Sequence, residues 1–110
     1  MVGDFFLDAY FDCDPHLNEP SVETGKTAYQ VVRTRRQAGA AGTVVANLAA
    51  LGCHQIDTIG YIGNDGEGFE LRRALTGLGA DTSHLIVDEG RVTPTYGKPC
   101  LVETAKTRAW

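Results

Sequence analysis

The stretch AGAAGTVVANLAALG, residues 38–52, predicts a turn of small residues that leads directly into an amphipathic helix. Its first five residues are all glycine or alanine, which allow the backbone to approach another group closely. Val44, Leu48 and Leu51 recur at i, i+4 and i+7, the spacing of a buried helical stripe, and Gly52 stands where a left-handed cap is expected. Spacing alone leaves two explanations of the turn equally open: amides that face a polar or anionic ligand, or tight packing of the helix.

Strand-like and helix-like stretches alternate on both sides of this helix. Residues 12–27 are polar with two prolines and predict a loop, and residues 28–36 predict a partly exposed strand. Further strands are predicted at residues 56–62, 84–87 and 100–102. This order predicts an α/β fold with right-handed crossovers and a largely parallel sheet.

A second helix is predicted after residue 65. Asp65 is placed to cap its start, and Gly79 is placed to end it. The expected buried stripe of this helix consists of Phe69, Leu71, Leu75 and Leu78.

Composition limits the class of protein. The 110 residues suffice for one domain, and 14 acidic against 10 basic residues give a net charge of −4, which argues against nucleic-acid binding. No apolar run is long enough to span a membrane, and the start of the sequence does not resemble a signal peptide, so we expect a cytoplasmic protein. Cys13, Cys53 and Cys100 are too widely spaced to indicate a disulfide framework or a zinc site, so no metal site is predicted.

Two glycine-containing motifs fail as nucleotide-binding signatures. Gly25-Lys26-Thr27 matches the end of a phosphate-binding loop, but Pro20 replaces the required first glycine and a polar stretch precedes it, so we expect a surface hairpin. The stretch GYIGNDGEG, residues 60–68, lacks the dinucleotide-binding spacing. It is better explained as a strand end, a tight turn and a helix cap.

Five blocks of the sequence are Gly3-Asp4 with Leu7-Asp8, residues 38–52, residues 60–68, residues 78–81, and Thr93-Pro94-Thr95. In order and spacing, these five blocks together resemble the amino-terminal part of the ribokinase-like, or PfkB, carbohydrate kinases. The start G-D-x-x-L-D-x-Y is most similar to the branch that includes heptose-phosphate kinases.

The resemblance implies a three-layer α/β/α kinase that transfers the γ-phosphoryl group of ATP, with Mg²⁺, to a hydroxyl of a sugar or sugar phosphate. It places the Asp8 carboxylate on sugar hydroxyls and the backbone of Gly39, Ala40 and Gly42 beside the sugar. Thr43 stands where the family usually has an asparagine, Asn47 matches another frequent asparagine, and Lys98 is a candidate anion contact. Residues 12–37 resemble a small β lid, whose strand at 28–36 implies a homodimer interface.

The resemblance also implies that part of the machinery lies elsewhere. The Gly-Ala-Gly-Asp motif that carries the family's catalytic base does not occur in this sequence. We therefore expect residues 1–110 to form the amino-terminal part of one kinase domain, with part of the sugar site, without catalytic residues, and inactive alone. The alternative is a stand-alone, non-catalytic sugar-binding or regulatory module.

Overall fold

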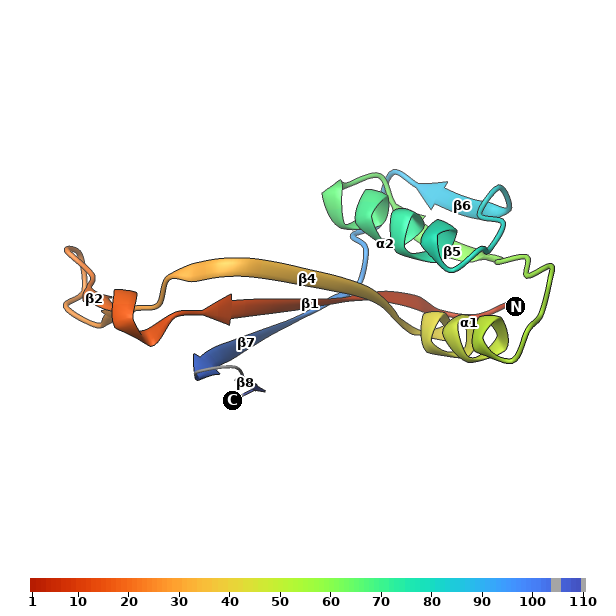
Figure 1. Cartoon of the computed structure of the whole chain (residues 1–110). Coiled ribbons are helices and arrows are strands. Elements are labelled where there is room, and N and C mark those ends of the chain that lie inside the picture. Colours follow the sequence, from red (N-terminus) through yellow and green to blue (C-terminus); the bar gives the residue numbers. More distant parts are fainter. Residues whose placement is uncertain (104–105, 110) are drawn as a thin grey trace. The chain divides into compact units, whose positions relative to one another are not determined.

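The computed structural model of the chain describes residues 1–103 and 106–109, which divide into two compact units (Figure 1). The first unit contains residues 1–8 and 36–96, and the second contains residues 9–35 and those from 97 onward. Three strands contribute residues to both units, and with β8 (Lys106–Ala109) they form a sheet of order β4-β1-β7-β8. These three are β1 (Phe5–Cys13), β4 (Val31–Ala40) and β7 (Thr95–Glu103).

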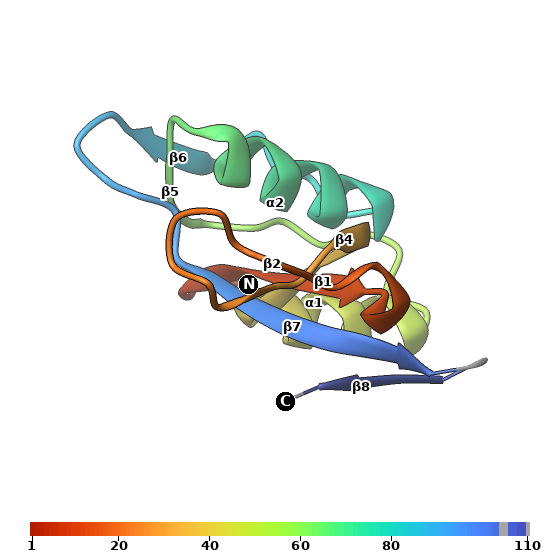
Figure 2. The same cartoon turned by 90° about the vertical axis from the view of Figure 1, so that its left-hand side faces the viewer.

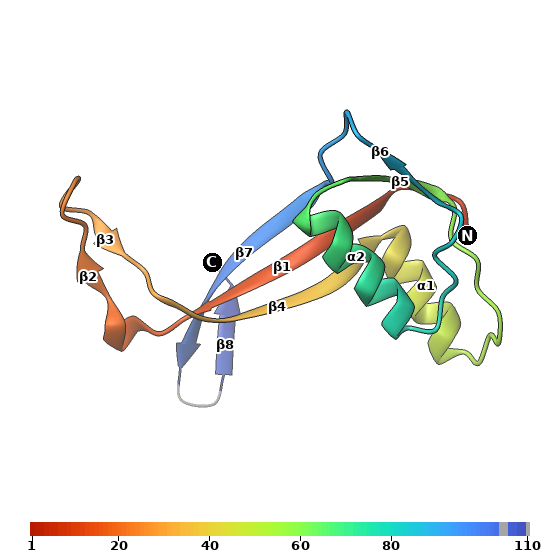
Figure 3. The ribbon, with the colours of Figure 1, turned by 90° about the horizontal axis from the view of Figure 1, so that it is seen from above.

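The first unit contains the two α-helices, α1 (Ala41–Ala50) and α2 (Gly66–Gly77). It also holds a ladder of β5 (Gly60–Gly63) and β6 (Leu85–Asp88), which run parallel with Gly60 opposite Leu85. Figure 3 shows α2 along one side of this ladder. The predicted strand–helix–strand crossover is confirmed here. The expectation of a largely parallel sheet was wrong, because β7 and β8 pair antiparallel (Figure 2).

The core of the first unit joins both helices to four strands, β1, β4, β5 and β6. Its completely covered side chains include Val45 of α1 and Leu71 and Leu75 of α2, each at 0% exposure. The other members of this core are Phe5, Leu7, Ala38, Ala41, Ile56, Ile62, Ala80 and Leu85, with Leu48, Ala49, Ala74 and Leu78 packed against them.

The predicted helical stripes were partly wrong. Val44 is 42% exposed, Leu51 82% and Phe69 65%. In α1 the buried face includes Ala41, Val45, Leu48 and Ala49, so small alanines complete a stripe that the larger residues alone did not reveal. The predicted caps are confirmed: Gly52 and Gly79 have positive φ values of 91° and 88°.

The predicted turn over residues 38–42 is absent, because β4 continues to Ala40 and α1 begins at Ala41. The Ala41 amide donates a 2.9 Å hydrogen bond to the carbonyl of Asp4, the residue before β1, which joins the first helical turn to the start of that strand. A side chain on Gly42 would overlap the Cβ atom of Ala38. The small residues therefore let strand and helix pack closely at an abrupt junction.

The second unit carries a short hairpin in place of a featureless loop. The turn η1 (Pro15–Leu17) precedes β2 (Glu19–Pro20), which pairs antiparallel with β3 (Thr27–Ala28). The loop predicted over residues 12–27 also began two residues too early, since β1 continues to Cys13. Gly25, at φ 69°, lies in the connection between β2 and β3. The surface hairpin expected for Gly25-Lys26-Thr27 is confirmed.

Asp65 organises the glycine-rich stretch at residues 60–68. Its Oδ1 accepts hydrogen bonds from the Gly68 amide and the Thr93 hydroxyl, both at 2.7 Å, and its Oδ2 accepts from the Thr93 amide at 2.9 Å. Thr93 is 1% exposed and its hydroxyl also accepts from the Gly63 amide at 2.9 Å. Side chains on Gly63 or Gly68 would overlap backbone carbonyls, so both glycines are needed to close this network.

We expect Asp65→Asn to destabilise the chain by about 1–3 kcal/mol. The amide nitrogen of asparagine would face a backbone N–H group whose hydrogen bond a carboxylate oxygen now accepts. The hydrogen bonds from Thr93, then that from Gly68, hold the pKa of Asp65 below its usual value. This stabilisation is present above the unfolded-state pKa of about 4 and is lost as the pH falls through the lower folded-state pKa.

Urea denaturation between pH 7 and pH 3 measures both effects. The matched control is Glu67→Gln, which removes a charge from the first turn of α2 without removing a cap. Equal stability of Asp65→Asn and the wild type, with equal acid sensitivity, would contradict the account.

Candidate functional site

Asp8 of β1 and Gly39 of β4 lie directly against each other in the first unit. A Cβ atom on Gly39 would come within 2.6 Å of Asp8 Oδ2 and 2.9 Å of Asp8 Cγ, closer than real Cβ contacts allow. The half-buried Asp8 carboxylate therefore occupies the space that a side chain at position 39 would fill. The structure brings together two residues that the sequence resemblance placed beside a sugar.

The residue after this contact is strained. Ala40 has φ 53° and ψ −119°, and among the described non-glycine residues it alone has positive φ. This region favours glycine, and an alanine there costs on the order of 1–3 kcal/mol. Ala40 is also the N-cap of α1 and makes no side-chain capping hydrogen bond. The strained turn thus lies between Gly39, which contacts Asp8, and the first turn of the helix.

Thr43 and Asn47 are exposed on α1, one helical turn apart. Thr43 borders a hollow of about 390 Å³, whose lining includes neither Asp8 nor Gly39. The structure therefore places both polar residues on the helix that follows Ala40. The other residues around the hollow are Arg36, Gln37, Ala38, Ala46, Ala74 and Leu78.

Lys98 belongs to the second unit, where it contacts Tyr10. Its Nζ lies 3.5 Å from the Tyr10 hydroxyl and 5.0 Å from the ring centroid. The guanidinium carbon of Arg35 lies 5.0 Å from the centroid of the same ring. Tyr10 therefore holds two cations in one small region through cation–π contacts.

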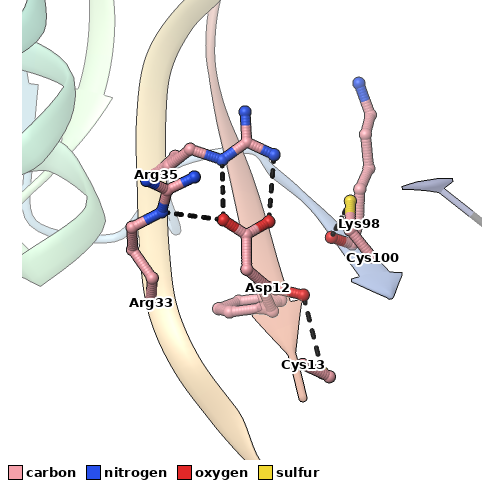
Figure 4. A network of polar contacts seen from close by, with 7 residues as sticks. Asp12, Cys13, Arg33, Arg35, Lys98 and Cys100 are labelled. Atoms are coloured by element: carbon pink, nitrogen blue, oxygen red, sulfur yellow. Dashed lines mark hydrogen bonds and ion pairs between the residues drawn. The ribbon is translucent and has the colours of Figure 1, made fainter. Parts of the chain in front are cut away.

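Asp12 forms an ion network that the sequence analysis did not identify (Figure 4). Its carboxylate is 1% exposed and accepts from Arg35 through Nε at 2.9 Å and Nη2 at 3.0 Å, and from Arg33 Nε at 2.9 Å. The hydrogen bond from Arg35, opposed by burial and reinforced by Arg33, lowers the pKa of Asp12. The alternation of Arg33 with Arg35, and of Tyr10 with Asp12, is the strand signal that could have revealed it.

Other chemistry is not assembled within the part of the chain that the structure describes. No three histidine, cysteine or carboxylate side chains gather there as a metal-binding group. Cys13 and Cys100 are buried free thiols, and Cys53 is an exposed one. Among the same residues, no helix combines the length and apolar character needed to cross a bilayer.

No protein-family model matches the sequence, but curated relatives do. The chain is 38% identical over 93 residues to the bifunctional protein HldE of Geotalea uraniireducens, and 37% identical over 93 residues to HldE of Desulfatibacillum aliphaticivorans. Each alignment covers 84% of this chain and 18% of the relative. The chain thus spans about a fifth of the length of these relatives.

Solved structures share the fold over nearly the whole chain. A carbohydrate kinase from Agrobacterium tumefaciens matches with a TM-score of 0.64 at 18% identity, covering 99% of this chain and 34% of the kinase. A PfkB protein from Polaromonas sp. JS666 matches with a TM-score of 0.55 at 19% identity, covering 98% and 32%. An uncharacterized sugar kinase from Pyrococcus horikoshii, solved in complex with ATP, matches with a TM-score of 0.55 at 21% identity, covering 99% and 32%.

The resemblance to ribokinase-like (PfkB) carbohydrate kinases is confirmed. The α/β fold of this chain, a mixed sheet with helices, is that of the amino-terminal portion of these kinases. Asp8 and Gly39 lie in the first unit of this ribokinase-like portion, and Lys98 lies in its second unit.

We expect Ala40→Gly to stabilise the chain by about 1 kcal/mol, because the strain at positive φ exceeds the entropic cost of a glycine. Urea denaturation followed by circular dichroism measures the change. The matched control is Ala46→Gly within α1, which lowers stability because the residue is helical. A loss of stability in both variants would show that Ala40 is not strained.

Proposed function

We propose that this chain forms part of the sugar-binding site of an ATP-dependent carbohydrate kinase. The observation that carries the proposal is the Asp8 carboxylate packed against Gly39, immediately before the strained turn into α1. Curated relatives and solved kinases support it through sequence and fold.

The chemistry of this group suits a sugar. An ionised carboxylate can accept two hydroxyl hydrogen bonds at once, which matches a pair of adjacent sugar hydroxyls. Of the small residues that follow, Ala40 is exposed, whereas Gly39 and Gly42 are buried, so Ala40 is the one of the three whose backbone a sugar could approach from solvent. Thr43 and Asn47 on α1 supply further hydrogen-bonding groups for a sugar that extends along the helix.

The proposal assigns ATP binding and phosphoryl transfer to residues outside this chain. Transfer requires positioned charges around the phosphoryl group and a base for the attacking hydroxyl. The described residues offer no cluster of carboxylates for Mg²⁺, so no step of the proposal runs through a metal held here. Residues 1–110 alone are accordingly inactive, and their contribution to the kinase is cytoplasmic sugar recognition.

Asp8→Asn in the complete gene product tests the sugar site. Loss of one or two charged hydrogen bonds, each worth about 1.5–3 kcal/mol, lowers kcat/KM for the sugar at least 10-fold and leaves the KM for ATP nearly unchanged. ADP release with a panel of pentoses, hexoses, heptoses and their phosphates measures the change.

The matched control is Asp88→Asn, which removes an exposed carboxylate at the end of β6. Unchanged sugar kinetics in Asp8→Asn would remove Asp8 from the site. A gene product that binds sugars through Asp8 but never releases ADP would favour the stand-alone binding module.

The second unit supports an anionic sugar. Arg33, Arg35 and Lys98 bring three cations around Tyr10 and Asp12. A phosphate group that binds at this unit would meet these cations.

We expect Lys98→Ala to lower kcat/KM for phosphorylated sugars about 10-fold while changing that for unphosphorylated sugars less than 2-fold, since one charge-assisted contact is lost. Lys26→Ala, in the exposed β2–β3 connection, is the control. An equal effect of Lys98→Ala on both kinds of sugar would show that Lys98 does not select an anion.

A homodimer through the lid strand completes the proposal. β4 is an edge strand of the sheet, and its residues Val31 and Val32 are 52% and 54% exposed. Exposed edge strands with apolar side chains favour pairing with a second chain. The proposal therefore includes a lid at residues 12–37 and a homodimer that forms through the strand of this lid.

A further inference from the structure

Two aromatic side chains of the first unit, Phe6 of β1 and Tyr96 of β7, form a pair. Their ring centroids lie 5.4 Å apart and their planes are inclined at 47°, a geometry within the range of interacting aromatic rings. Phe6 is half-buried, whereas Tyr96 is 54% exposed. We call these two residues the aromatic pair. The pair leaves much of the Tyr96 ring open to a ligand from solvent.

The aromatic pair lies on the same face of β1 as Asp8. Phe5 and Leu7 are each 1% exposed and belong to the core, so the odd-numbered side chains at the start of β1 point inward. Side chains alternate between the two faces of a strand. Phe6 and Asp8 are both half-buried and therefore share the face of β1 that points away from this core.

The order of the strands places different neighbours on the two sides of Asp8. In the sheet β1 lies between β4 and β7 (Figure 3). Gly39 of β4 contacts the Asp8 carboxylate from one side and adds no side chain there. Tyr96 of β7 comes from the other side and contacts Phe6, two residues before Asp8. A carboxylate and a half-exposed aromatic ring thus occupy neighbouring places on one face of the sheet.

This combination matches the two kinds of surface that a cyclic sugar presents. The edge of a sugar ring carries hydroxyl groups, which a carboxylate can bind, whereas its faces carry C–H groups, which are apolar. Binding sites for small molecules commonly join aromatic side chains to a few placed polar groups in this way. An open-chain polyol has no fixed C–H face, so an aromatic ring favours the cyclic form.

We infer that Tyr96 is a further substrate-contacting residue, whose ring stacks on the C–H face of a pyranose held by Asp8. Phe6 is a positioning residue that fixes the Tyr96 ring. The inference rests on the sugar site proposed above and adds to it the ring form of the substrate. The phenol hydroxyl of Tyr96 has no part in it, because stacking needs only the ring.

Variants of Tyr96 in the complete gene product test the stacking contact. We expect Tyr96→Ala to raise the KM for the sugar at least 10-fold and to change kcat less than 3-fold, since the contact is made equally before and during transfer. Tyr96→Phe keeps the ring and stays within 2-fold of the wild type. Tyr96→Leu retains bulk beside Phe6 without an aromatic face, and still raises KM at least 3-fold.

The positioning role of Phe6 has its own pair of variants. Phe6→Leu raises the KM for the sugar at least 3-fold at nearly constant kcat, whereas Phe6→Tyr, which retains an aromatic ring, stays within 2-fold of the wild type. The matched control is Phe69→Ala, which removes a 65% exposed ring from α2. We expect this control to leave the sugar kinetics unchanged.

The ring form of the substrate is tested with two probes: the sugar of the panel with the highest kcat/KM, and the open-chain alditol made from it by borohydride reduction. We expect the best sugar to be a pyranose that the wild type prefers over its alditol at least 10-fold. Tyr96→Ala reduces this preference below 3-fold, whereas Asp8→Asn impairs the use of both probes.

The outcomes separate this inference from the proposed sugar site. Loss of sugar use in Asp8→Asn with unchanged KM in Tyr96→Ala and Tyr96→Leu would overturn the stacking contact and leave the sugar site standing. Unchanged kinetics in all of these variants would overturn both. Equal impairment of sugar and alditol by Tyr96→Ala, or an equal rise in the KM for ATP, would show that Tyr96 supports the fold and does not recognise a sugar ring.

Discussion

The Asp8 carboxylate fills the space beside Gly39, and the chemistry proposed for this chain depends on that contact. Because no side chain fits at position 39, β4 must bring a glycine next to β1 just before the chain turns into α1. Gly42 then meets Ala38 closely enough to exclude a side chain of its own. The sequence left two explanations of these small residues open, close helix packing and a backbone that faces a polar group. The structure shows that the small residues allow close helix packing and also place the backbone beside a carboxylate.

A second polar network holds the scaffold and has no proposed contact with substrate. Asp65 gathers the end of β5, the start of α2 and Thr93 through hydrogen bonds of 2.7–2.9 Å. Residues 60–68 and Thr93-Pro94-Thr95 are two of the blocks that carry the family resemblance. Their residue types are therefore explained largely by the need to form this hydrogen-bond network. The blocks containing Asp8 and Gly39 retain the polar contact that a sugar would use.

Local rules predicted the features that depend on a few neighbouring residues: the Asp65 cap, the positive φ of Gly52 and Gly79, and the hairpin around Gly25. These local rules failed for features that depend on contacts between segments far apart in the sequence. Val45 and not Val44 faces the core because Ala41 and Ala49 complete its stripe. The Asp12 network requires β1 beside β4, and the contact of Asp8 with Gly39 requires the same pairing, so neither could be derived from spacing alone.

A crystal structure of the complete gene product with its preferred sugar tests the central claim most directly. The account predicts that the two Asp8 carboxylate oxygens lie within about 2.6–3.2 Å of adjacent sugar hydroxyls, with the sugar ring beside the backbone of Gly39. A sugar bound elsewhere, with Asp8 still packed on Gly39 and touching no hydroxyl, would contradict it.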